Sequence, residues 1–169
     1  MSDIYSKKQK EEILNLARER FKLCEEAERD IRAVGLEDLE FRAGNQWPEQ
    51  VKRERELDAR PCLTINKMPQ YVRQVTNEQR QNRPRIKVVH FDDNADLKTA
   101  EIIQGIIRNI EVTSNAEAAY DVGFEGAAQK GFGYWRIITE YVDEMSFKQV
   151  AKIKTIKNHF SVFILIHIK

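Results

Sequence analysis

The chain has 169 residues, 41% of them hydrophobic, which is enough to form one domain with a core. Its 28 Lys and Arg nearly balance 27 Asp and Glu, so the net charge of +1 excludes a globally basic nucleic-acid-binding protein, although a local basic patch remains compatible with it. Cys24 and Cys62 are too few for a disulfide framework and lack metal-ligand spacing, so we expect two free, at least partly buried thiols.

The termini carry no signal for secretion or membrane insertion. The first dozen residues include several charges, which a secretory signal does not tolerate in its apolar region. The longest largely apolar run, Phe160 to Ile168, has nine residues and contains Ser161 and His167, whereas a membrane-spanning helix needs about 20. We therefore expect a soluble, intracellular protein without a membrane segment.

The first 34 residues predict one long helix. Apolar residues recur at spacings of three and four, and Glu28 with Arg32 forms an acid-first i,i+4 pair. The apolar stripe fits packing on the same domain or on a neighbouring subunit. Gly35 predicts a break, and a shorter helix is expected from Leu36 to Ala43, before Gly44.

Residues 35–130 are expected to be mainly helical. Further helices are predicted at 48–59, 67–82 with Asn66 as the N-cap, 96–112 capped by Asp93 or Asn94, and 114–130. Ser114 and Glu117 have capping-box spacing. The last helix is rich in Ala and Gly, which predicts close packing, and residues 85–91 alternate as a strand does.

Residues 131–169 form the predicted β part. Alternation from Gly133 to Val142, turn residues from Asp143 to Ser146 and a return strand at 148–156 predict a hairpin, and 160–166 could add a third strand. The fold class is α+β, with a long N-terminal helix and several packed helices before a small antiparallel hairpin or three-stranded sheet.

No pattern in the sequence predicts catalysis or a cofactor. Gly131 and Gly133 follow a helix and precede a strand, the reverse of a dinucleotide-binding loop, so they predict a helix C-cap and a tight entry into the hairpin. His90, Asp92 and Asp93 are the one metal-like cluster, but the two carboxylates more simply begin a helix. A metal-dependent hydrolase centred on His90 and Asp92 is the second alternative function.

The segment from residue 67 to 87 is locally basic. We interpret Lys67, Arg73, Arg85 and Lys87 as candidate phosphate contacts. The segment could also pair with the acidic stretch 92–125, within the subunit or across a subunit interface. A small helical DNA-binding module using residues 67–87 is therefore the alternative function.

Several ordered motifs resemble portal proteins of short-tailed double-stranded-DNA phages. They span residues 36–162 and comprise Leu39–Phe41 with Gly44, Gln46 and Trp47; Arg60–Lys67; Gln79–Pro84; Ile106–Glu111; Ser114–Ala116 with Ala119–Asp121; and Gly131–Arg136. The residues that we select as candidates for assembly or packing are Trp47, Arg80, Arg83, Tyr120, Trp135 and Arg136.

The resemblance implies a non-enzymatic structural subunit of the virion, made in the host cytoplasm. Such proteins form a dodecameric ring of identical subunits that contacts terminase, scaffold, capsid and tail proteins and passes double-stranded DNA during packaging and ejection. After Asn158 the sequence departs from the family pattern, ending in an apolar tail that is similar to a truncated terminus. We therefore expect an N-terminal fragment that lacks the family's stem, clip and barrel.

Overall fold

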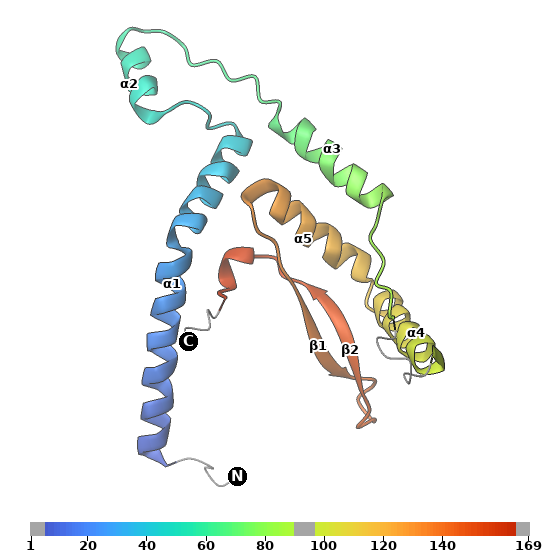
Figure 1. The fold of residues 1–169 in the computed structure, drawn as a ribbon. Coiled ribbons are helices and arrows are strands. Elements are labelled where there is room, and N and C mark those ends of the chain that lie inside the picture. The colour runs from blue at the N-terminus through green and yellow to red at the C-terminus, as the bar shows by residue number, and fades with distance from the viewer. Residues whose placement is uncertain (1–5, 90–96, 165–169) are drawn as a thin grey trace.

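The computed structural model describes residues 6–89 and 97–164 as five α-helices, two strands and one short 3₁₀-helix (Figure 1). This arrangement confirms the predicted α+β class. The elements, in chain order, are α1 (Lys7–Ala43), α2 (Glu49–Leu57), α3 (Met68–Gln81), α4 (Leu97–Thr113), α5 (Ala116–Lys130), β1 (Trp135–Tyr141), β2 (Gln149–Thr155) and η1 (His159–Ser161).

The first helix is continuous, so the predicted break at Gly35 is wrong. Ser6 and Gln9 form a capping box at the start, and Gly44 ends the helix in the left-handed conformation with φ of 110°. Gly35 is buried where α1 crosses the end of α5, and a Cβ there would lie 3.1 Å from the Lys130 carbonyl oxygen. The glycine therefore serves close helix packing rather than a turn.

Helix α5 is the central element of the fold (Figure 1). It packs against α1, α3, α4 and the hairpin, and its small residues face inward. Ala116 and Ala119 form the core cluster with Ile153 of β2. The Ala- and Gly-rich sequence thus predicted this packing helix correctly, and the absence of large side chains lets four partners approach it.

The predicted capping box at Ser114 is wrong. Helix α4 runs on until Ser114 donates to the Ile110 carbonyl, and Asn115 then turns the chain with φ of 49° before α5 begins at Ala116. The Glu117 carboxylate binds Arg83 instead of folding back to the helix start. A tertiary ion pair has therefore replaced the local cap. The predicted caps Asp93 and Asn94 lie outside the described residues.

The predicted hairpin is confirmed. Strands β1 and β2 pair antiparallel with Trp135 opposite Thr155 and Tyr141 opposite Gln149, and Gly131 caps α5 with φ of 83°. The third strand is wrong for the part of it that is described. Residues 159–161 form η1, and the backbone beyond binds side chains of α1 rather than a sheet neighbour.

The predicted strand at 85–91 is also wrong over its described part. Residues 85–89 are extended but pair with no strand. The Gln104 side-chain amide of α4 donates to the Ile86 carbonyl and accepts from the Val88 N–H, both at 2.7 Å. One amide thus satisfies the two backbone groups that a neighbouring strand would otherwise bind.

Candidate functional site

Four of the six sequence-selected candidates gather around α5. Arg80 and Arg83, at the end of α3 and just after it, both approach Asp121: Arg80 Nε lies 3.2 Å and Arg83 Nη2 3.1 Å from Asp121 Oδ2. Arg83 also pairs with Glu117 at 2.7 Å. Only 17% of the Asp121 side chain is exposed, so this junction is a partly buried, charge-assisted contact within one subunit.

Tyr120 of α5 faces the hairpin and contacts Trp135 of β1. Their rings meet edge to face with centroids 5.3 Å apart, and the Tyr120 hydroxyl donates to Glu111 at 3.1 Å. Burial, together with the hydrogen bond to Glu111 and its negative charge, raises the pKa of Tyr120. This pair positions β1 on α5.

The other two candidates lie elsewhere. Trp47 donates through Nε1 to the Leu63 carbonyl at 3.3 Å, and the Arg55 guanidinium lies over its ring. Trp47 therefore connects the segment before α2 to the segment after it. Arg136 is exposed on β1. The six candidates therefore form no single site.

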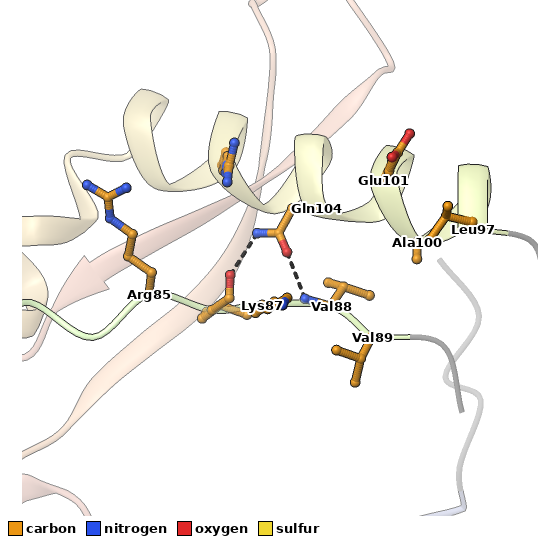
Figure 2. A pocket seen from close by; sticks show the side chains of 10 residues that line it. Arg85, Lys87, Val88, Val89, Leu97, Ala100, Glu101 and Gln104 are labelled. Carbon is orange, nitrogen blue, oxygen red and sulfur yellow. Dashed lines mark hydrogen bonds between the residues drawn. The ribbon is translucent and has the colours of Figure 1, made fainter. Parts of the chain in front are cut away.

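The candidate phosphate contacts are all exposed. Lys67, Arg73, Arg85 and Lys87 make no side-chain ion pair within residues 6–89 and 97–164, in contrast to Arg80 and Arg83. Arg85 and Lys87 line an open hollow of about 580 Å³ between the extended segment 85–89 and α4 (Figure 2). Among the described residues, the lining also includes Arg108 and a single carboxylate, Glu101.

A second polar junction was not selected from the sequence. Arg32, at the middle of α1, donates to the carbonyls of Phe160 and Val162, while Glu28 accepts from the Ile164 N–H at 2.7 Å. The i,i+4 spacing predicted the Glu28–Arg32 pair, which is present at 2.6 Å. What the spacing could not predict is that both side chains bind a backbone some 130 positions away. We call this contact the α1 latch.

His159 of η1 is buried beside α5. Its ring lies against Gly126, where a Cβ would come within 2.3 Å of His159 Nδ1. Burial lowers the pKa of His159, the charge of Lys130 lowers it further, and the backbone carbonyls of Ile156 and Phe132 offset part of this effect. The imidazole is therefore held neutral in the folded chain.

This neutral histidine predicts acid sensitivity. His159 binds a proton more readily in the unfolded chain than in the folded one. Its contribution to the free energy of unfolding is therefore fully present above pH about 6.5 and is lost as the pH drops towards the lowered pKa. The slope from this one group cannot exceed about 1.4 kcal/mol per pH unit. Urea unfolding at pH 7.5, 6.5 and 5.5 measures it. The His159→Gln variant should show a flatter profile over this range, and an equal slope in both proteins would contradict the assignment.

The described residues carry no metal-like or membrane-spanning feature. Within 6–89 and 97–164, no three His, Cys, Asp or Glu side chains gather as metal ligands do. No helix in those two ranges is both long and apolar enough to cross a bilayer. His90, Asp92 and Asp93, the cluster considered from the sequence, lie outside the described residues. Cys24 is buried and Cys62 half-buried, and both are free, as predicted.

The amount of exposed surface is unusual for a chain of this size. A compact monomer of 19.8 kDa is expected to expose about 8,600 Å², but this chain exposes 14515 Å². Large apolar side chains contribute, among them Phe147 of the hairpin loop at 96% exposure. Few apolar residues are buried in the described part of the chain: Cys24, Val72, Ala116, Ala119 and Ile153. Such a surface is typical of a protein that binds other polypeptide chains when it functions.

Comparison with known families identifies the chain. The family described as phage P22-like portal protein matches residues 18–165, which is most of the sequence. The chain belongs to the P22-like portal family. A search of the curated proteins gives no match.

Membership in the P22-like portal family confirms the resemblance seen in the sequence motifs. The match begins within α1 and extends past η1, so it includes the latch and the hairpin. The portal family is structural rather than catalytic and belongs to phage particles, where its members assemble with other phage proteins.

Proposed function

We propose that the chain acts as a ring-forming structural subunit of the phage portal vertex, in genome packaging and ejection. The family match over residues 18–165 carries the proposal. About 5,900 Å² of surface beyond that of a compact monomer supports it, since a standard interface takes about 800 Å² from each partner. The chain thus has surface for the two neighbours that a ring requires.

In this proposal the subunit has no enzymatic activity and needs no cofactor. Twelve copies surround the DNA path, and the ring contacts terminase, scaffold, capsid and tail proteins. The subunit is made in the host cytoplasm and becomes part of the virion. Within the ring, its role is to contact the neighbouring subunits.

Solution mass tests the ring-forming step. Light scattering after size exclusion should give a discrete species at about twelve times the 19.8 kDa of one chain, stable to dilution over about a hundredfold. The physical reason is that exposed apolar surface becomes buried on assembly. A monomer at every concentration would overturn self-assembly by this chain, and a broad, concentration-dependent aggregate would do the same.

A DNA-binding module using residues 67–87 is the second candidate. The observation that favours it is a set of exposed cations, two of which line the hollow beside α4: Lys67, Arg73, Arg85 and Lys87, which form no side-chain ion pair within residues 6–89 and 97–164. Duplex binding through them should weaken with salt by about 0.9 log unit per phosphate contact. Filter binding of a duplex at several salt concentrations tests this. Affinity that does not change with salt would contradict the candidate.

A further inference from the structure

Helix α1 has a second, exposed face built from two matched rows. Each of four acidic residues is followed four positions later by an apolar one: Glu12 and Leu16, Glu19 and Leu23, Asp30 and Val34, Glu37 and Phe41. Both rows have spacings of seven, eleven and seven, and at about 3.6 residues per turn such spacings keep each row straight along the helix. The eight residues therefore form one continuous strip, which we call the acidic–apolar strip.

The acidic–apolar strip lies away from the contacts that α1 makes within the chain. The inward side carries Gly35 against the end of α5 and the latch residues Glu28 and Arg32. All eight residues of the strip are exposed, and Leu23 and Val34 expose about half of their side chains, at 49% and 55%. The side-chain carboxylates of Glu12, Glu19 and Glu37 make no ion pair or hydrogen bond with any other described residue.

One face of the hairpin has the opposite charge. Residues directly opposite in the ladder share a face, which places Arg136 with Lys154 and Ile138 with Lys152. Ile153 points to the other face, where it is buried against α5. The face turned away from α5 is the basic hairpin face, and its members are Arg136, Ile138, Glu140, Lys148, Val150, Lys152 and Lys154.

The basic hairpin face carries more positive than negative charge. It holds four cations, whereas Glu140 is its one carboxylate and already binds both Lys152 and Lys154. Arg136 stands directly opposite Lys154, and like charges in that position destabilise a sheet. An acidic partner with apolar side chains would neutralise the cations and cover Ile138 and Val150, which are half-buried.

We infer that the acidic–apolar strip of one copy docks on the basic hairpin face of a second copy. The two surfaces match in charge and both include apolar residues, which distinguishes this pairing from simple attraction of cations to DNA phosphates. They are different surfaces of the same chain, so the contact is head-to-tail, and such contacts close into rings when the rotation permits. The inference rests on the proposed ring function and names the surfaces that build it.

Charge reversal on either side tests the pairing. The variant Glu19→Lys with Glu37→Lys, and the variant Arg136→Glu with Lys148→Glu, should each lose the oligomer or raise its dissociation constant by at least about tenfold. Combining all four substitutions in one chain restores complementary charges, as does mixing the two double variants. Both samples should regain the parent mass by light scattering. A matched control for the first of these variants, Glu56→Lys with Glu101→Lys, makes the same charge change at exposed positions outside both surfaces and should leave the mass unchanged.

The outcomes separate this inference from the proposed function. A parent chain that never assembles overturns the ring proposal, and with it the pairing. A parent that assembles while both double variants keep its mass overturns only the pairing. If the Arg136→Glu, Lys148→Glu variant keeps the parent mass but loses affinity for duplex DNA, the hairpin face binds nucleic acid and the inference is wrong. Circular dichroism of every variant should match the parent, because all the altered side chains are exposed.

Discussion

Substituting Gly133→Ala is expected to give the largest loss of stability of any single methyl group added to this chain. A Cβ at Gly133 would lie 1.7 Å from the Gly123 carbonyl oxygen and 3.0 Å from the Ala127 amide nitrogen. Both are backbone atoms of α5, which cannot move aside as a flexible side chain could. We expect the free energy of unfolding to fall by about 3 kcal/mol or more, measured by urea denaturation.

Gly105→Ala is the matched control for this substitution. Gly105 lies inside α4, and a Cβ there would meet nothing within 4 Å. Because alanine loses less conformational entropy than glycine in a helix, this variant should gain about 0.5–1 kcal/mol. Equal behaviour of the two variants would mean that the α5–hairpin junction is looser than the structure has it.

Asp121→Asn should give the second large effect. The substitution keeps the shape of the side chain but removes the charge that both Arg80 and Arg83 contact. Two guanidinium groups would then face each other across a partly buried junction without a shared anion. We expect α3 to detach from α5 more readily and the free energy of unfolding to fall by about 2–3 kcal/mol.

Glu117→Gln provides the comparison for Asp121→Asn. Glu117 contacts Arg83 alone and its side chain is 73% exposed, so its ion pair is screened by solvent. The expected loss is about 0.5 kcal/mol or less in the same urea experiment. A loss at Asp121 no larger than this would show that the shared carboxylate is not what joins α3 to α5.

The sequence predicted those parts of the fold that depend on local pattern. Apolar periodicity located the helices, and strict alternation with turn residues located the hairpin to within two residues at each strand end. Three of the failures share one physical cause: a side chain from another element took the place of a local partner. Gln104 satisfied the extended segment 85–89, Arg83 took the carboxylate of Glu117, and Glu28 with Arg32 bound the segment after η1.

The candidate residues were likewise predicted from the sequence only in part. Arg80, Arg83, Tyr120 and Trp135 were selected because of motifs, and the structure brings them to α5, but their common neighbour Asp121 had no role assigned to it. A local excess of acid between residues 92 and 125 indicated that partners existed without saying which. The acidic–apolar strip of α1 was missed for another reason. Its seven–eleven–seven spacing follows the helix only if Gly35 does not interrupt it.

The α1 latch has a consequence for how the chain folds during synthesis. Helix α5 and the hairpin are neighbours in sequence and can fold as soon as they leave the ribosome, because their contacts have low contact order. Arg32 cannot make its hydrogen bond to the Phe160 carbonyl until Phe160, 128 positions later, has been synthesised. Until then the part of α1 around Arg32 stays uncovered and can meet other nascent chains. The latch therefore forms only after residue 164 has been made, whereas the contacts of α1 with α5 at Gly35 and Arg42 can form as soon as α5 is complete.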